Sequence, residues 1–286
     1  MNFVPEKPEF GKARAKARTC ILNAAEALTG KRWGDDTFIV ATSGRCEYRN
    51  KGIDVYLDAL ATLRERTQSH TLALVLVPAW VDVPREDLRA SLQKHKSGPL
   101  HDPVMTHTLH NCDHDPIYNR IHQLGFANQE YDGMTVIYVP CYLNGNDGIF
   151  NMTYYDLLIG LDATVFPSYY EPWGYTPLES VAFGVPTVTT SLSGFGQWVR
   201  ASLSAGFDAS GVDVINRTDS NYHEVANAIA DSLQQLLFAS PGKRAEISIS
   251  ARETASKAAW SYFIKHYIVT FDVALKKAHE RIEAKR

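Results

Sequence analysis

Short apolar runs alternate with helical patterns along most of this chain of 286 residues. After the first run, Ile53, Tyr56, Leu60 and Leu63 recur every three or four positions, which predicts the buried face of a helix. Strands that alternate with helices are typical of a parallel sheet with helices on its faces. The pattern therefore predicts an α/β fold, a parallel sheet flanked by helices. The runs typical of strands span residues 37–42, 72–77, 134–139, 163–167, 186–190 and 212–215.

Several helix ends are marked in the sequence. Thr153 and Asp156 have the spacing of a capping box ahead of two leucines. Pro177 suits a first helical turn, because its missing N–H needs no partner there, and Gly184 suits the stop of the same helix. We therefore expect one helix to begin beside Thr153 and another to end at Gly184.

The domain organisation follows from the length and from the last part of the pattern. Beyond His223 the pattern is helical almost to the end, with a break at residues 240–242. A chain of this length forms one large domain or two small ones. We expect a single domain over residues 1–286, with a core at about 37–240 and C-terminal helices at about 243–284.

The composition narrows the class of protein. The chain has 29 Lys and Arg residues against 32 Asp and Glu residues, a formal charge of −3, and 45% hydrophobic residues. Such a chain buries a real core, so disordered, collagen-like and disulfide-stapled classes are excluded. The only basic clusters are short, such as residues 12–18, so we expect no binding of nucleic acid.

The sequence also bears on the compartment. The N-terminus has no signal-peptide pattern, and the longest apolar run, residues 72–81, is broken by Pro78 and far too short to cross a bilayer. We expect a cytoplasmic protein that has no membrane partner. The cysteines have no paired spacing, which indicates free thiols in a reducing compartment: Cys20, Cys46, Cys112 and Cys141.

The first predicted strand ends in a segment rich in cations. Gly44 opens a turn, and Arg45, Arg49 and Lys51 follow within seven residues. Arginine forks and a mobile lysine charge together neutralise a diphosphate well. The segment therefore predicts a phosphate site, and the alternative is a solvated basic loop.

A second strand end carries two acids across a turn that opens a helix. Glu171 and Glu179 lie eight positions apart, and Gly174 between them lets the backbone approach a ligand closely. The N–H groups of Gly174, Tyr175 and Thr176 would form an anion-binding nest at the helix start. Glu179 could accept hydrogen bonds from vicinal sugar hydroxyls. The alternative is a capped helix with surface acids.

Two further segments are weaker indications. Residues 189–196 end a strand in hydroxyl residues and glycines, which suits a ligand loop or a plain connection. The other indication is a histidine-rich stretch at residues 107–115, on a predicted loop without the fixed spacing of zinc ligands. We expect no metal there, and interpret the stretch as polar loop packing or substrate contact. Its possible ligands are His107, His110, Cys112, Asp113, His114 and Asp115.

These residues resemble one family closely. The segment Phe166–Glu179 reads FPSYYEPWGYTPLE, and it is followed by Gly184-Val-Pro and by Thr190–Gly196, TSLSGFG. Together with Arg45 and the segment Tyr48–Gly52, these motifs resemble the C-terminal half of the glycogen synthases of glycosyltransferase family 3, the animal and fungal type. The similarity runs from about residue 20 to about residue 216.

The resemblance implies a fold and an activity. It implies the C-terminal, Rossmann-like domain of a GT-B glycosyltransferase, and retaining transfer of glucose from UDP-glucose to the non-reducing 4-hydroxyl of an α-1,4-glucan. No metal or other cofactor is implied. The implied catalytic residues are Arg45 and Lys51 on the diphosphate and Glu171 at the reacting sugar; the implied donor-binding residues are Glu179 at the ribose, Tyr154 on the uracil, and Gly174, Tyr175 and Thr176 on the phosphates.

Three departures from the family qualify this expectation. The N-terminal Rossmann-like domain has no counterpart in the chain, so we expect it to act in cis or in trans, and we do not expect turnover by this chain alone. Residues 251–260 lack the arginine-rich helix that binds glucose-6-phosphate in eukaryotic members, so we expect no sugar-phosphate activation. Only about 25 residues separate Trp80 from Thr106, where eukaryotic members carry a long insertion used in oligomer contacts, and this compact form resembles bacterial members.

Two alternatives to this function stay open. One is a different retaining glycosyltransferase that uses another nucleotide sugar, because many of these share the Glu-x7-Glu pattern. The other is a non-catalytic module that binds a nucleotide or a glucan.

Overall fold

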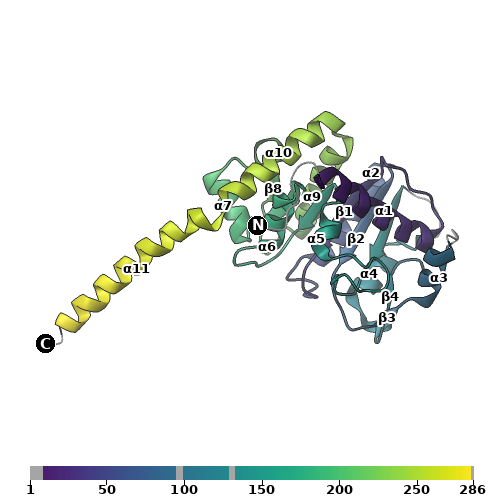
Figure 1. The fold of residues 1–286 in the computed structure, drawn as a ribbon, viewed down its shortest axis with the longest axis horizontal. Helices are drawn as coiled ribbons and strands as arrows, with labels where there is room; N and C mark the ends of the chain where they lie inside the picture. Colours follow the sequence, from purple (N-terminus) through teal and green to yellow (C-terminus); the bar gives the residue numbers. More distant parts are fainter. Residues whose placement is uncertain (1–8, 95–98, 129–132, 285–286) are drawn as a thin grey trace.

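A single six-stranded sheet organises the protein (Figure 1). The computed structural model describes residues 9–94, 99–128 and 133–284. The strands of the sheet are all parallel and lie in the order β5-β2-β1-β6-β7-β8. They are β1 (Phe38–Ser43), β2 (Thr71–Leu76), β5 (Met134–Tyr138), β6 (Ala163–Phe166), β7 (Thr187–Thr190) and β8 (Val212–Ile215). This order confirms the α/β prediction, and each predicted strand agrees with an observed one to within about a residue at either end.

The strand order reverses in the middle of the sheet. β1 lies beside β6, and the chain runs outward from this pair in both directions, as in doubly wound dinucleotide-binding folds. In such sheets ligands bind beyond the carboxyl ends of the strands at the point of reversal. The loops that follow β1 and β6 are therefore the ones that the topology places at a ligand site.

Helices cover both faces of the sheet. They are α1 (Glu9–Thr29), α2 (Ile53–Arg66), α3 (Glu86–Lys94), α4 (Pro116–Gln123), α5 (Tyr154–Leu158), α6 (Tyr175–Ala182), α7 (Gly194–Ser202), α8 (Phe207–Ser210), α9 (Tyr222–Phe238), α10 (Pro241–Lys257) and α11 (Trp260–Glu283). Successive residues of β1 belong to opposite faces: Phe38 and Val40 pack with α2 and α9, whereas Ile39 and Ala41 pack with α1 and α5. Burial on both faces is why the strands read as continuous apolar runs.

The marked helix ends lie where the sequence predicts them. Thr153 and Asp156 form a capping box at the start of α5. Pro177 is in the first turn of α6, and Gly184 follows the helix with a φ of 73°. Pro241 begins α10, so this helix starts within the predicted break at residues 240–242.

Other elements were not predicted. β3 (Val81–Pro84) and β4 (His107–Leu109) form an antiparallel pair, and a short 3₁₀ helix spans Cys112–His114. The histidine-rich stretch is therefore not the simple loop that we expected. The core also extends to α1, outside the expected core range, because Ala17 and Ile21 are buried against the sheet.

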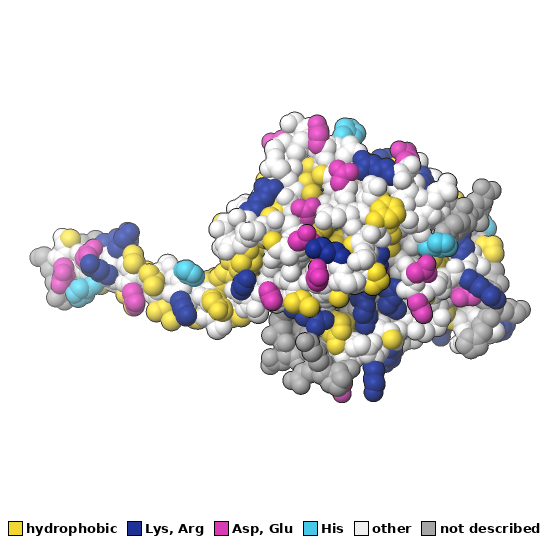
Figure 2. All heavy atoms as spheres, turned by 90° about the horizontal axis from the view of Figure 1, so that it is seen from above, with side chains coloured by type: hydrophobic (Ala, Val, Ile, Leu, Met, Phe, Trp, Pro, Cys, Tyr) yellow, Lys and Arg dark blue, Asp and Glu magenta, His cyan; other side chains and the backbone are white. Residues whose placement is uncertain are grey.

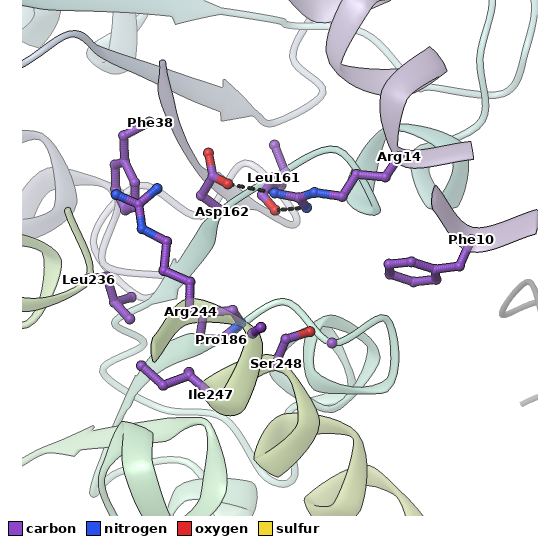
Figure 3. A pocket seen from close by; sticks show the side chains of 12 residues that line it. Phe10, Arg14, Phe38, Leu161, Asp162, Pro186, Leu236, Arg244, Ile247 and Ser248 are labelled. Atoms are coloured by element: carbon purple, nitrogen blue, oxygen red, sulfur yellow. Dashed lines mark hydrogen bonds and ion pairs between the residues drawn. The ribbon is translucent and has the colours of Figure 1, made fainter. Parts of the chain in front are cut away.

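Two arginines attach α1 to the amino edge of the sheet, where the strands begin. Arg14 donates to the carboxylate of Asp162 at 2.5 Å and Arg18 does so at 2.8 Å. The same carboxylate accepts from the backbone N–H of Ile39 at 2.8 Å. The side chains of Arg14 and Asp162 line a cavity of about 220 Å³ between α1 and α10. Figure 3 shows Arg14 and Asp162 facing each other there. The two arginines of the N-terminal basic cluster therefore form a structural clamp.

The last helix leaves the body of the protein. α11 extends away from the sheet and its covering helices, and hydrophobic side chains alternate with charged ones along it (Figures 1 and 2). Within the described ranges, no helix combines the length and the hydrophobicity that crossing a lipid bilayer takes. The four cysteines are free thiols, as expected.

Candidate functional site

Two loops meet where the strand order reverses. The loop after β1 contacts the loop after β6 through its backbone, because the N–H of Tyr169 donates to the carbonyl of Asn50 at 2.7 Å. Gly52, at the start of α2, has a φ of 69°, and a Cβ on it would lie 2.1 Å from the carbonyl oxygen of Pro167. Only glycine allows this approach, so Gly52 is what lets the cationic segment lie directly against the acidic one.

Lys51 and Glu171 are in direct contact at this meeting point. The lysine Nζ forms an ion pair with Oε2 of the glutamate, and the side chains are 15% and 22% exposed. One predicted phosphate ligand and one predicted catalytic acid, 120 residues apart in sequence, therefore share one place.

Arg45 has a different environment. Its guanidinium lies 3.1 Å from Oε1 of Glu47, and its side chain is 78% exposed. Glu47 in turn accepts a hydrogen bond of 2.6 Å from Asn50. Arg45 thus lies on the solvent side of the same loop. Within the described part of the chain it forms no ion pair with Glu171 or Glu179.

The loop that carries Glu171 is held by the segment after β7. Gly194 donates its N–H to the carbonyl of Glu171 at 3.0 Å, and Phe195 donates to Trp173 at 2.6 Å. A Cβ on Gly194 would lie 2.2 Å from the carbonyl oxygen of Pro172. The third predicted segment therefore supports the second, and Ser193 caps α7 by accepting from Gly196 at 3.0 Å.

The amino end of α6 is open. Gly174 precedes the helix with a φ of 104° and a ψ of 79°, and no side chain caps the first turn. Pro177 has no N–H, so Tyr175 and Thr176 carry the amides that are left without partners inside the helix. Tyr175 is exposed. This end of the helix has the chemistry of an anion site and lies directly after Glu171 in the chain.

Glu179 lies one turn further along α6. Its Oε1 accepts a hydrogen bond of 2.8 Å from the hydroxyl of Tyr155 on α5. Burial raises the pKa of Glu179, and the bond from Tyr155 opposes that shift. Burial, followed by the bond to Glu179, raises the pKa of Tyr155 to about 12, so the phenol stays a donor at neutral pH. No role was predicted for Tyr155 from the sequence. The signal that could have indicated it is a second aromatic residue in the first turn of α5.

Tyr154, the neighbour of Tyr155, connects α5 to the first loop. Its hydroxyl lies 2.9 Å from the hydroxyl of Ser43 at the end of β1. Its ring is tilted against that of Tyr155, with centroids 5.5 Å apart, and burial raises the pKa of its phenol. The residue that the resemblance assigns to the uracil therefore lies beside the residue that holds Glu179.

The histidine-rich stretch contributes one buried side chain to a different cluster. Ligand atoms of His107, Cys141 and Asp147 lie within 4.8 Å of one another. The imidazole is already bonded through Nδ1 to Thr106 and through Nε2 to the carbonyl of Asp147, both at 2.9 Å. The carboxylate of Asp147 accepts from three backbone N–H groups of residues 149–151. These bonds make the cluster a clamp between β4 and a loop, in line with polar loop packing.

The carboxyl edge of the sheet thus joins a lysine, two glutamates and an open helix end. Comparison with known proteins identifies the family of the chain. The family model for glycogen synthase matches residues 88–285, more than half of the chain. The chain belongs to the glycogen synthase family.

Curated relatives agree with this membership. A glycogen (starch) synthase of Neurospora crassa is 26% identical over 86% of this chain and 43% of its own length. One from Dictyostelium discoideum is 26% identical over 85% of this chain and 34% of its own length. The rat liver protein of that name is 25% identical over 85% of this chain and 42% of its own length. The chain therefore spans less than half the length of these relatives.

Solved structures confirm the fold. WaaG, a glycosyltransferase involved in lipopolysaccharide biosynthesis, aligns with a TM-score of 0.50 at 17% identity, over 87% of this chain and 50% of WaaG. The apo structure of OtsA aligns with a TM-score of 0.54 at 12% identity, over 89% of this chain and 48% of OtsA. The chain has the fold of one half of a GT-B glycosyltransferase, as the resemblance implied.

Proposed function

We propose that this chain is the donor-binding half of a glycogen synthase, which transfers glucose from UDP-glucose to the non-reducing 4-hydroxyl of an α-1,4-glucan with retention of configuration. Family membership and the names of the relatives support the proposal. One observation carries it: Lys51 meets Glu171 at the reversal of strand order, directly before the open amino end of α6. A cation, an acid and a helix end at one place suit a sugar diphosphate.

In the proposed reaction the charge on the leaving diphosphate is neutralised by the protein. Lys51 binds the diphosphate as a mobile point charge, and Arg45 reaches it from the exposed side of the loop once the ligand competes with Glu47. The N–H groups at the start of α6 add a preorganised dipole. Loss of one such preorganised donor costs about 2.7–4 kcal/mol of transition-state stabilisation in well-studied oxyanion sites. These groups supply the positive charge without a metal or another cofactor.

The remaining residues orient the donor. Glu171 lies at the reacting sugar, and Glu179 accepts hydrogen bonds from the ribose hydroxyls. Tyr154 stacks on the uracil. A retaining transfer can proceed by attack on the same face of an oxocarbenium-like sugar, so Glu171 need not act as the covalent nucleophile of a retaining hydrolase. Its task is to stabilise and place the sugar.

The proposed activity includes a second domain, joined to this chain or separate from it, that binds the glucan. Two experiments test this. Calorimetric titration of the chain with UDP, ADP and GDP should give the tightest binding for UDP, whereas equal binding of all three would favour another nucleotide sugar. Mixing the chain with the N-terminal half of a glycogen synthase should produce glucose incorporation into glycogen. A mixture that binds UDP but incorporates no glucose would contradict the enzymatic proposal and favour a binding module.

A further inference from the structure

α5 connects two parts of the proposed donor site through two adjacent tyrosines, Tyr154 and Tyr155. Although the two residues are adjacent on α5, their hydroxyls bond in different directions. Tyr154 bonds Ser43 at the end of β1, whereas Tyr155 bonds Glu179 on α6. α5 therefore braces the first loop with one side chain and the acid of α6 with the other.

The ring of Tyr155 is held in place by stacking. It lies almost parallel to the ring of Phe183, at an interplanar angle of 4° and a centroid distance of 5.7 Å. Phe183 is 2% exposed. Glu179 and Phe183 are four residues apart, on the same face at the end of α6, so one tyrosine contacts both. The phenol cannot turn away from the carboxylate without losing the stack.

The bond leaves half of the carboxylate available. Oε1 of Glu179 accepts from Tyr155, and Oε2 makes no hydrogen bond to any residue in the described part of the chain. A carboxylate with one oxygen fixed has a single orientation for the other, which is what recognition of two vicinal hydroxyls requires.

We propose that Tyr155 is a positioning residue, which fixes one oxygen of Glu179 and thereby presents the other to the ribose hydroxyls of the nucleotide. This rests on the proposed function. Tyr155 acts through Glu179 and does not itself contact the ribose. The bond also favours the ionised carboxylate that accepts from hydroxyls, since burial alone would favour the protonated form.

Tyr155→Phe tests the role, because it removes the hydroxyl and keeps the ring stacked on Phe183. Calorimetry should show UDP binding about tenfold weaker than in the wild type at pH 7. Binding of the 2′,3′-dideoxy analogue of UDP should change little, because that ligand lacks the hydroxyls that Glu179 recognises. As the pH is lowered, UDP affinity should begin to fall at a higher pH in Tyr155→Phe than in the wild type, because loss of the bond raises the pKa of Glu179.

Two controls separate this role from a structural one. Tyr118→Phe removes another phenol–carboxylate bond, of 2.6 Å to Asp102, away from the site, and should leave UDP affinity unchanged. In a Glu179→Ala background, Tyr155→Phe should have no further effect on UDP affinity. An equal loss for UDP and the dideoxy analogue, or a full effect in the Glu179→Ala background, would overturn the positioning role. Failure of the wild type to bind UDP would instead overturn the proposed function.

Discussion

Lys51 and Glu171 form an ion pair across the reversal of strand order, and both side chains are largely shielded from solvent. The pair joins the loop after β1 to the loop after β6. A diphosphate bound by Lys51 would compete with Glu171 for the same ammonium group. The ion pair therefore holds the two loops together, and a bound donor must either displace Glu171 from Lys51 or share the ammonium group with it.

The competition predicts the effect of Glu171→Gln. Loss of the charge leaves Lys51 without its anionic partner, so UDP affinity should rise about two- to fivefold, as expected for a pair worth under 1 kcal/mol. Calorimetry at constant salt measures this, with the exposed Glu253→Gln as a control for net charge. Weaker binding in Glu171→Gln would mean that the glutamate holds Lys51 in its binding pose.

The glycine that supports the Glu171 loop predicts a stability effect. Gly194→Ala places a Cβ 2.2 Å from the carbonyl oxygen of Pro172, so the loop has to move. The free energy of unfolding should fall by about 1–3 kcal/mol, and UDP affinity should fall with it. Gly242→Ala meets nothing within 4 Å in the first turn of α10 and should raise stability by about 0.4–1 kcal/mol. Urea unfolding distinguishes the two, and equal effects would argue against a tight loop crossing.

The clamp at the amino edge predicts loss of stability without loss of binding. Asp162 is bonded to Arg14, Arg18 and the N–H of Ile39. Asp162→Asn leaves the two guanidinium groups without a counter-charge and should lower the free energy of unfolding by about 3–5 kcal/mol. UDP affinity, measured where the variant is folded, should not change, because the clamp lies at the edge opposite the site. A matching loss of affinity would show that the two edges are coupled.

Much of the fold could be predicted because it is encoded locally. Strands such as β1 are buried on both faces and read as apolar runs, and the capping box at Thr153 is complete within four residues. The β3 and β4 pair could not be predicted in this way. β3 contains no buried residue and ends in Pro84, and its partner at His107 lies more than 20 residues away, so periodicity carries no trace of the pairing.

The candidate site could likewise be predicted only in part. The residue types at the strand ends indicated Lys51 and Glu171. Their meeting depends on β1 and β6 being neighbours in the sheet, an order that the α/β pattern alone does not specify. The bond of Tyr155 to Glu179 depends on how α5 packs against α6, which spacing does not encode. The exposed place of Arg45 likewise depends on its pairing with Glu47 within the loop.

The partly buried position of Glu179 predicts that removing its charge stabilises the protein in a pH-dependent way. Because burial raises the pKa of this carboxyl in the folded protein, its ionised form costs stability above that pKa and costs none below the ordinary value of an unfolded glutamate. Glu179→Gln should raise the Tm by a few degrees at pH 7, with the difference vanishing as the pH falls below that ordinary value. Thermal unfolding across pH measures it; a lower Tm for the variant at pH 7 would contradict the sign.

The role of Lys51 as the main ligand of the donor diphosphate is tested most directly by calorimetric titration of Lys51→Ala with UDP. Arg66→Ala, which removes a surface pair with Asp231 at the far end of α2, is the matched loss of one cation. UDP affinity should fall about ten- to a hundredfold in Lys51→Ala, as for a charge-assisted bond, and stay at the wild-type value in Arg66→Ala. Equal UDP affinity in the wild type and Lys51→Ala would contradict the proposed donor site.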